Sequence, residues 1–542
     1  MSLKERLLWH GYLPENVPPA FYTADVADLL AEDSGGEWWS QTKSPVRPAP
    51  FNASKRGITR RTFSFVHPTT MHDATKFVVT HWETIQGFFA QSNFSLSVPK
   101  VSEVADRAVE IATHSHLEAS RIERLSQYRF VAKTDISRFY HSIYTHSIPW
   151  AFHGKNGAKA DRDHRSAAVF FNRADWLLRC GQDGQTVGIP VGPDTSRVFA
   201  EIVATAIDLE FIKRSHSDTI AVLRHVDDVW IGANSHADAE QTLWRYREAM
   251  REFELDINES KTKIYSAEFR FTDQWPSDLS VALERALETS TKQKSERLRA
   301  ALEQAFAMTV ATGDDGILKY VIRYLDRHSD GWENWAIVEP FLKRCVVHFG
   351  HTVDYISRVL LWRHLAKGDL DTDVWGSILA EIIDRHGRIG NDSEVCWAAY
   401  ACAVLGCKVS ADSADHVVRN CGALSVVTIL NCAAAGLTRR SVFASVRERL
   451  RLESANGAFW PVILEWKSCR WRDHKHITVG NEVINSLVSH EARLFDITRL
   501  PLVFKDIAKS NFDEVDNAIE NRPTMYDDEH SQEGPDEDDD DF

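Results

Sequence analysis

The sequence predicts an α+β protein in which a half of mixed strands and helices precedes an all-helical half. Three observations support this fold class. β-rich runs such as RFVAKTDI and TIAVLRHVDDVWIG occur up to about residue 270, Gly/Pro turns such as GIPVGP lie between them, and amphipathic helices follow one another from about residue 280. At 542 residues the chain is too long for one core, so two or more domains are expected.

The composition is typical of a globular protein. Hydrophobic residues make up 43% of the chain and charged residues 26%. No apolar run approaches the ~18 residues that a membrane span needs, and the start, MSLKERLLWHGY, is charged where a signal peptide would be apolar. The eight cysteines lack CxxC spacing, and several lie in apolar segments such as EVCWAAYACAVLGC. This pattern predicts reduced thiols in a cytoplasmic protein with no membrane partner.

Most of the net charge of −15 lies at one end of the chain. Residues 526–542, YDDEHSQEGPDEDDDDF, include ten acidic residues and no Lys or Arg. This composition predicts a disordered, solvated tail, and the alternative is a nucleic-acid mimic that competes for a basic groove. Because the rest of the chain is not basic overall, any nucleic-acid site must be a local patch.

Two acidic segments of the first half carry the predicted chemistry. VAKTDISRFY indicates an apolar strand that ends at Asp135, followed by a turn and a helix, and RHVDDVWIG indicates a β-hairpin with Asp227 and Asp228 at its tip. If the two strands are neighbours in one sheet, Asp135 and Asp227 face each other. The alternative for an isolated DD pair is a turn or a helix cap.

Converging carboxylates need a positive partner, because buried like charges are costly. Mg²⁺ is a hard ion that prefers one or two protein carboxylates together with substrate phosphate and water. Two such ions can deprotonate an attacking hydroxyl and stabilise a leaving pyrophosphate. Two Mg²⁺ ions, with Mn²⁺ as the alternative, are therefore the expected cofactor, and the predicted metal ligands and catalytic residues are Asp135, Asp227 and Asp228.

Between the two acidic strands, residues 181–213 form a Gly/Pro-rich turn that runs into a helix, with Asp194 or Thr195 as the expected cap. Gly188 and Gly192 would let the backbone approach a flat ligand closely, as packing against a base pair requires. After the hairpin, LDINESKTKIY supplies lysines that could meet phosphate or pyrophosphate.

The second half reads as amphipathic helices joined by short connectors that contain Gly, Asp, Asn or Ser. Helix pairs recur at roughly 30–45-residue spacing without a sharp sequence repeat, which favours an irregular stack of the HEAT kind. Its Trp, Cys and Leu residues are expected to form a core.

Four of these segments carry a family resemblance. DISRFY, QTVGIPVGPDTS, HVDD and INESKTK, in this order, resemble motifs A, B, C and D of reverse transcriptases. GIPVGPDTSR and SIYTHSIPWAFHGK are most similar to the bacterial defence-associated group, the abortive-infection and "unknown group" enzymes, which join a polymerase-like half to a helical HEAT-like half. The resemblance covers roughly residues 50–270. The helical half resembles the family only in its general pattern of successive amphipathic helices.

The resemblance implies roles for individual residues. Asp135 and Asp227 would bind the two catalytic metals, and Asp228 would be a supporting carboxylate. Tyr140 stands at the steric-gate position, where an aromatic ring excludes a ribose 2′-hydroxyl and favours deoxynucleotides; the alternative is a helix-core tyrosine. Lys261 would be the phosphate-side lysine, or else an exposed lysine at a helix start. The residues expected to line the template and the nascent base pair are Gln185, Gly188, Pro190, Gly192 and Ser196.

Two further segments extend the resemblance. FNASKRGITRRTFSFVHP is similar to the fingers segment whose basic residues hold the triphosphate, and its candidates are Lys55, Arg60 and Arg61. Adjacent strand residues point to opposite faces, so at most one of Arg60 and Arg61 enters the site. FSLSVPK also resembles the defence group. His225 is a departure, because the hairpin motif usually opens with Tyr or Phe; the metal site should survive, whereas the holding of the primer end should differ.

The implied function is an enzyme, a metal-dependent RNA-directed DNA polymerase (a DNA nucleotidyltransferase) that uses dNTPs in anti-phage defence. It would copy an RNA template or an associated non-coding RNA, or make DNA without a template from a protein hydroxyl. In the latter case the DNA product would be covalently attached, and the candidate tyrosines are Tyr12, Tyr22 and Tyr526.

Two other functions stay open. An RNA-directed RNA polymerase would share the palm carboxylates, although Tyr140 argues against it. A catalytically silent palm scaffold with a partner-binding helical domain is opposed by the presence of all three carboxylates. No acidic cluster with strand character follows residue 270, so no RNase H domain is expected, and the acidic end does not fit the basic tail of a maturase.

The expected domains are reverse-transcriptase-like fingers and palm over residues 1–275, a HEAT-like helical domain over residues 276–515, and the acidic tail over residues 516–542. The resemblance also implies that the helical half builds a homo-oligomer, a trimer or a hexamer, and encloses the product in a groove.

Overall fold

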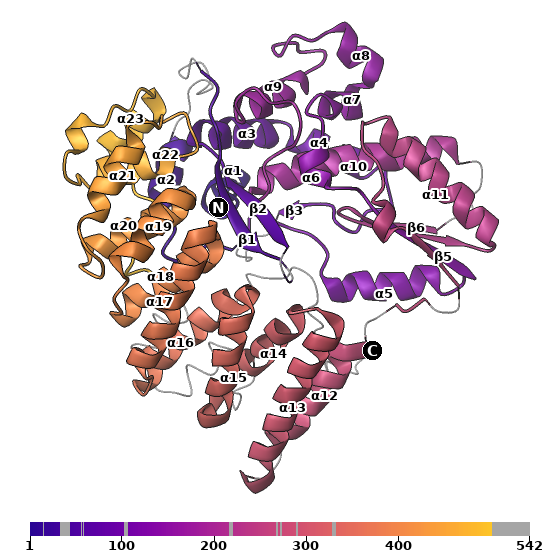
Figure 1. Ribbon diagram of the computed structural model, residues 1–542. Coiled ribbons are helices and arrows are strands. Elements are labelled where there is room, and N and C mark those ends of the chain that lie inside the picture. Colours follow the sequence, from indigo (N-terminus) through magenta and orange to yellow (C-terminus); the bar gives the residue numbers. More distant parts are fainter. Residues whose placement is uncertain are drawn as a thin grey trace.

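The structure is a computed structural model (Figure 1) that describes residues 1–14, 16–32, 44–55, 57, 59–101, 107–215, 221–266, 269–271, 274–288, 291–327 and 332–500. The predicted acidic tail, with Tyr526, lies outside these residues. Strands are confined to the first half of the described chain, as the sequence predicts, and the second half is helical. Within the described segments, every helix is too short or too polar to cross a lipid bilayer.

A strand pair flanked by helices forms the N-terminal part. β1 and β2 pair antiparallel with Phe51 opposite Phe63, and both phenylalanine side chains are buried. The capping box of Ser2 and Glu5 starts α1, and Pro68 occupies the first turn of α3, where a missing N–H has no cost. The elements of this part are α1 (Leu3–Trp9), α2 (Ala24–Glu32), β1 (Ala49–Ser54), β2 (Arg60–Phe65), α3 (Pro68–Thr80), α4 (Trp82–Phe89), β3 (Lys100–Val101), β4 (Val109–Glu110) and α5 (His114–Leu125).

A four-stranded antiparallel sheet in the order β6-β7-β5-β8 is the centre of the next part. One face packs Val131, Leu223 and Trp230 against α5, and the opposite face joins the main core under α10 and α11. Burial on both faces explains why its strands read as almost continuous apolar runs. The elements are β5 (Phe130–Asp135), α6 (Phe139–Ser142), α7 (Ser147–His153), α8 (Lys155–Ala160), α9 (Asn172–Cys180), α10 (Asp194–Arg214), β6 (Ala221–His225), β7 (Asp228–Ala233), α11 (His236–Arg251), the 3-10 turn η2 (Glu259–Lys261) and β8 (Lys263–Tyr265).

The second half consists of helices that run in an arc from beneath the sheet to the N-terminal elements (Figure 1). They are α12 (Gln274–Glu288), α13 (Thr291–Thr312), α14 (Gly316–Arg327), α15 (Trp335–His348), α16 (Val353–Lys367), α17 (Thr372–Ile389), α18 (Asp392–Leu405), α19 (Ala411–Asn420), α20 (Ala423–Ala434), α21 (Val442–Leu450), α22 (Trp460–Ser468) and α23 (Glu482–Ser489). The apolar pattern of residues 413–436 suggests one helix, and the structure divides it at Cys421 and Gly422. The reason is tertiary, because Gly422 donates its N–H to Asp392 Oδ1 at 2.8 Å and lies against the carbonyl of Pro50.

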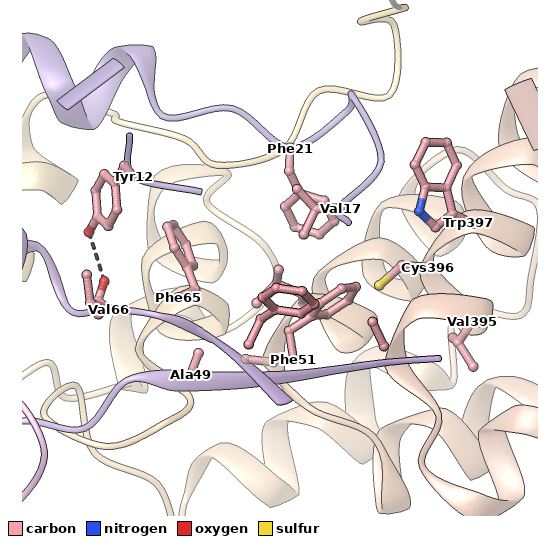
Figure 2. Packing of buried hydrophobic residues seen from close by; sticks show 14 of the residues in the cluster. Tyr12, Val17, Phe21, Ala49, Phe51, Phe65, Val66, Val395, Cys396 and Trp397 are labelled. Carbon is pink, nitrogen blue, oxygen red and sulfur yellow. Dashed lines mark hydrogen bonds between the residues drawn. The ribbon is translucent and has the colours of Figure 1, made fainter. Parts of the chain in front are cut away.

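The two halves share one hydrophobic core. Figure 2 shows residues from three segments around it: Tyr12, Val17 and Phe21 of the N-terminal segment, Ala49, Phe51, Phe65 and Val66 of the strand pair, and Val395, Cys396 and Trp397 of α18. Trp397 also donates its indole N–H to the carbonyl of Asn16 at 2.8 Å. Removing such side chains from water is the main stabilising contribution to a core. The boundary at residue 275 stays a prediction, and the core crosses it.

The end of the described chain returns to its beginning. Tyr22 N donates to the carbonyl of Leu494 at 3.0 Å, and the rings of Phe21 and Phe495 meet edge to face with centroids 4.9 Å apart. All eight cysteines are free thiols, five of them buried, in agreement with the predicted reduced state. The HEAT-like character of the helical half stays a prediction.

Candidate active site

Three acidic residues meet at one end of the four-stranded sheet. β5 and β7 are antiparallel neighbours, and their register places Asp135 opposite Asp228. Asp227 lies in the two-residue turn that joins β6 to β7, and its carbonyl accepts the N–H of Ile136 at 3.0 Å. The ladder partner of Asp135 is thus Asp228, one position from the expected Asp227, because the turn takes up Val226 and Asp227. The three residues come together.

The electrostatics of this cluster is that of crowded, partly buried carboxylates. Burial first, and then the charges of Asp228 and Asp135, raise the pKa of Asp227 to about 6, and Lys261 opposes this shift. Lys261 Nζ donates to Asp135 Oδ2 at 2.5 Å. Partial burial lowers the pKa of Lys261, but its bond to Asp135 and the neighbouring charges outweigh this effect and raise it overall. Lys261 is therefore the positive partner that the acidic residues find within the chain.

The donor set fits a hard divalent cation. Asp135 is 3% exposed, and its Oδ1 is buried without a hydrogen-bond partner, although buried carboxylate oxygens are almost always satisfied. Among the described residues, no group of three or more His, Cys, Asp or Glu side chains has the spacing of a complete metal site. Mg²⁺ needs only one or two protein carboxylates, since substrate and water supply the rest.

The turn that follows Asp135 is joined to the Gly/Pro-rich turn before α10. Ile189 N donates to the carbonyl of Tyr140 at 2.8 Å, and Gly188 N donates to that of Ile143 at 2.8 Å. Tyr140 is half-buried, and its ring meets Phe139 edge to face. These main-chain bonds fix the predicted steric-gate residue relative to the predicted base-pair side of the site.

Contacts with other parts of the protein require glycine at two positions of this turn. Gly188 has φ +87°, and a Cβ there would lie 3.2 Å from the carbonyl oxygen of His141. Gly192 has φ +125°, and its Cβ position faces Pro14 and the carbonyl of Ser64 at 3.5 Å. Both conformations favour glycine. The structure thus gives these glycines an intramolecular reason in addition to the close ligand approach that the sequence suggests.

The other predicted base-pair residues differ in exposure. Gln185 is exposed at the surface of the turn, whereas Pro190 and Ser196 are buried. The predicted helix cap is wrong in detail, because α10 begins at Asp194 after Pro193 and has no side-chain cap bond. Asp194 instead accepts the N–H groups of Ala108 and Val109 at 2.9 and 3.2 Å and the guanidinium of Arg107.

The predicted triphosphate residues separate. Arg60 forms a two-pronged ion pair with Glu394 of α18, in which Nη2 and Oε2 are 2.8 Å apart, and also donates to Asn52. Arg61 lies on the other side of the strand, where its charge acts on His141. Lys55 is half-buried and its N–H donates to the carbonyl of Thr59 at 3.0 Å. Of the two arginines, Arg61 is the one whose charge reaches the turn after Asp135, through His141.

Two residues that the sequence reasoning missed lie next to Tyr140. Arg138 is exposed and has φ +48°, a left-handed conformation that is rare outside glycine. Burial lowers the pKa of His141, and the positive charges of Arg138 and Arg61 lower it further. A cation at the third position after Asp135, the predicted metal ligand, was the available signal. Arg61 and Arg138 give the turn beside Asp135 a positive charge, and His141 is kept neutral.

The departure at His225 and the candidate priming tyrosines are also placed. His225 pairs with Asp228 in the hairpin, and its Nε2 lies 3.2 Å from the carbonyl of Ala112. Tyr12 is fully buried, and its hydroxyl donates to the carbonyl of Val66 at 2.9 Å. Tyr22 is half-buried and donates to Asp25 Oδ2 at 3.1 Å. In both tyrosines the hydroxyl hydrogen takes part in a hydrogen bond within the protein.

Comparison with solved structures gives several telomerases. Apo telomerase from Candida tropicalis is 11% identical, covers 82% of this chain and 76% of its own, and has a TM-score of 0.30. The same enzyme truncated from its C-terminal domain is 14% identical, with 46% and 57% covered and a TM-score of 0.27. Telomerase from Candida albicans with a TWJ fragment of telomeric RNA is 10% identical, with 62% and 66% covered and a TM-score of 0.26. The chain thus spans 57% of the truncated telomerase, and similarities of this size support no argument about function.

No curated protein sequence matches the chain. Residues 91–275 match the protein family described as Reverse transcriptase (RNA-dependent DNA polymerase). The matched part contains α5, the four-stranded sheet with its three carboxylates, and the turn before α10. The chain therefore contains a reverse transcriptase domain over residues 91–275.

Proposed function

We propose that this protein polymerises dNTPs with two divalent cations, Mg²⁺ or Mn²⁺, held by Asp135, Asp227 and Asp228, and that it acts in anti-phage defence. The observation that carries the polymerase proposal is the apposition of Asp135 with Asp228, beside Asp227, inside the segment that matches reverse transcriptases. The unpartnered, buried Oδ1 of Asp135 supports a role in holding a cation.

The chain's own residues divide the work around this cluster. Bound divalent cations would supply activation of the 3′-hydroxyl and stabilisation of the leaving pyrophosphate. Lys261 adds a positive charge that already contacts Asp135. Arg61 and Arg138 provide positive charge for the triphosphate, and the neutral His141 lies beside them. The bond from Ile189 N–H to the carbonyl of Tyr140 fixes the main chain at this residue, and the resemblance supports the role of its ring in excluding a 2′-hydroxyl.

The defence role is supported by GIPVGPDTSR and SIYTHSIPWAFHGK, which resemble the abortive-infection and "unknown group" enzymes. The same resemblance supports a HEAT-like helical half, a trimer or hexamer, and an RNA template, an associated non-coding RNA or template-free synthesis. The eight free cysteines favour a reducing compartment such as the cytoplasm. We also propose that residues 275 and 515 are the boundaries between the polymerase part, the helical domain and the acidic tail.

Protein priming, if it occurs, would not use Tyr12 in this fold, because its hydroxyl is buried and bonded. Digestion of protein incubated with labelled dNTPs, followed by mass spectrometry of tyrosyl peptides, tests the attachment. Nucleotide on a tyrosyl peptide supports priming by the protein, and label that never migrates with protein refutes it.

Incorporation assays test the polymerase. The purified protein is given Mg²⁺ and labelled dNTPs or rNTPs, with poly(rA)/oligo(dT) or without template, and is compared with Asp227→Asn and Asp228→Asn. The exposed Asp373, in the first turn of α17, supplies the matched control Asp373→Asn. We expect each site variant to lose activity at least about 1,000-fold, as removal of a central catalytic group does, and Asp373→Asn to keep it.

The same assay separates the alternatives. Preferred incorporation of rNTPs would indicate an RNA polymerase, against the role given to Tyr140. Absence of incorporation together with full phage protection by Asp227→Asn would indicate a silent palm scaffold. Mass photometry of the same preparation measures the number of subunits and tests the proposed oligomer.

A further inference from the structure

A buried ionic network lies directly behind the hairpin tip that carries Asp227 and Asp228. Arg224, the residue two before the turn, has no exposed surface, although arginine is rarely buried without partners. Its guanidinium binds two carboxylates of α10: Nη2 is 2.8 Å from Glu201 Oε1, and Nε is 3.0 Å from Asp208 Oδ2. α10 is thereby tied to the strand that leads into the tip.

Hydroxyl groups complete this network. Asp208 accepts Tyr246 OH at 3.0 Å through Oδ1 and Ser92 Oγ at 3.0 Å through Oδ2. Ser97 Oγ, which is 3% exposed as a residue, donates to Glu201 Oε2 at 3.3 Å. Thr205 Oγ1 also donates to Glu201 Oε1 at 3.4 Å, so one guanidinium and four hydroxyls serve the two buried carboxylates, which is how buried charges are made tolerable.

The turn that precedes Asp227 is strained. Val226 has φ +55°. The left-handed region costs a β-branched residue about 1–3 kcal/mol, and the conformation persists only where its surroundings impose it. Both of its main-chain polar groups are bound by the network. Val226 N donates to Ser97 Oγ at 2.8 Å, and Arg224 Nη1 donates to the carbonyl of Val226 at 3.3 Å.

The segment around Ser97 is itself fixed beside β6. Arg224 N donates to the carbonyl of Phe94 at 2.9 Å, and Leu96 N donates to the carbonyl of Arg224 at 2.8 Å. Ser97 therefore approaches the turn from an added strand-like edge. The segment FSLSVPK, which the sequence singles out without a role, supplies this contact.

We propose that Ser97, anchored by Glu201 and Arg224, is a positioning residue that holds the Val226 turn and so sets where Asp227 and Asp228 present their oxygens to a divalent cation. The inference rests on the proposed function for its catalytic consequence, and on the hydrogen bonds above for its structural part. It also means that α10, which carries the predicted base-pair residue Ser196, and the metal-binding tip are held by one set of groups.

Two serine variants isolate this role. Ser97→Ala removes the hydroxyl that binds the turn, and Ser92→Ala removes another buried hydroxyl, which binds Asp208 and does not contact the turn. Each hydroxyl makes more than one hydrogen bond, to Val226 N, Glu201 and Ser95 for Ser97 and to Asp208 and Phe94 N for Ser92, so both variants should lose some global stability. Only Ser97→Ala should loosen the tip.

The first readout needs no activity. Hydrogen exchange of the peptide that contains Val226, and Mn²⁺ binding followed by electron paramagnetic resonance, are compared in wild type and both variants. We expect Ser97→Ala to speed exchange at Val226 about tenfold and to weaken Mn²⁺ binding several-fold, since a lost bond of about 1.4 kcal/mol is a factor of ten. Ser92→Ala should change both by less than twofold.

The second readout is the steady-state rate with saturating dNTP. We expect Ser97→Ala to lower kcat about tenfold or more with a small change in KM, because misplacement of a reacting group is costly in rate, and Ser92→Ala to stay within twofold. Equal exchange and equal Mn²⁺ affinity in the two variants would overturn the proposal. A wild-type protein that binds Mn²⁺ but incorporates no nucleotide would overturn the proposed function and leave the positioning role to be judged by exchange and Mn²⁺ affinity alone.

Discussion

The ion pair between Arg60 and Glu394 allows a direct test of which fingers arginine holds the triphosphate. Arg60 lies on β2, and Glu394 belongs to α18, so the pair joins the β1–β2 strand pair to the helical half. The side chain of Glu394 is 2% exposed and that of Arg60 25%. The change is Arg60→Gln, which leaves a buried carboxylate without its cation.

The expected magnitude follows from this burial. Removing one partner of a buried pair costs about 3–5 kcal/mol, and the partly exposed Arg60 places this pair at the lower end, about 3 kcal/mol. Because 1.4 kcal/mol is a factor of ten, local opening of the β1–β2 pair should become about 100-fold more frequent. The double variant Arg60→Gln, Glu394→Gln should recover much of the loss, since the uncompensated charge is gone.

Native-state hydrogen exchange of β1 and β2 measures the opening, and steady-state kinetics measure the nucleotide KM. We expect Arg60→Gln to accelerate exchange and to leave KM within about twofold. Arg61→Gln should leave exchange unchanged and raise KM about tenfold, the effect of one lost charge-assisted contact. A tenfold increase in KM in Arg60→Gln with unaltered exchange would show that Arg60 contacts the nucleotide and that its pairing with Glu394 does not persist in solution.

Three further predictions follow from single residues. Gly188→Ala places a Cβ 3.2 Å from the carbonyl oxygen of His141 in a residue with φ +87°. Thermal unfolding should therefore show a loss of about 1–2 kcal/mol in the free energy of unfolding, and nucleotide incorporation should fall. An unchanged unfolding temperature would refute the requirement for glycine in this turn. Lys261→Met removes the cation that competes with Mg²⁺ for Asp135. The Mg²⁺ concentration for half-maximal activity should therefore fall roughly two- to fivefold, the effect of one lost ion pair, while kcat also falls. A higher Mg²⁺ requirement would contradict this competition between Lys261 and Mg²⁺. His67 is buried and neutral because burial lowers its pKa to about 3. The unfolded chain takes up a proton at this histidine below pH ~6.5, so the free energy of unfolding falls by about 1.4 kcal/mol per pH unit as the pH is lowered from about 6.5 to about 3. The urea midpoint of His67→Gln should fall less steeply over this range than that of the wild type.

The sequence predicts the parts of the site that depend on local patterns. The strand ending at Asp135 and the hairpin around Asp227 follow from apolar runs and a turn, and the family match places them in a reverse transcriptase domain. Their approach in space was a conditional expectation, since neighbouring strands cannot be identified from spacing alone. The roles of these residues stay predictions.

Other features depend on partners that are far away in the chain. Arg60 is a candidate phosphate ligand in the sequence because its segment resembles the fingers of reverse transcriptases, and its partner Glu394 is 334 residues later. Asp194 looks like a helix cap until Arg107 and two backbone amides from another segment occupy it. Gly422 lies in an apolar helical pattern, and its contacts with Asp392 and Pro50 explain the break. Local propensity cannot reveal such tertiary contacts.

The meeting of Tyr22 with Leu494 and of Phe21 with Phe495 has a consequence for biogenesis. The N-terminal segment reaches its final neighbours only after almost the entire described chain has left the ribosome. At about 5–20 residues per second, this delay is on the order of half a minute or longer. For most of that interval, until α18 has been made, the apolar side chains around Phe51 lack its cover, so a nascent polypeptide of this design should depend on chaperones more than one whose parts each complete a core in order of synthesis.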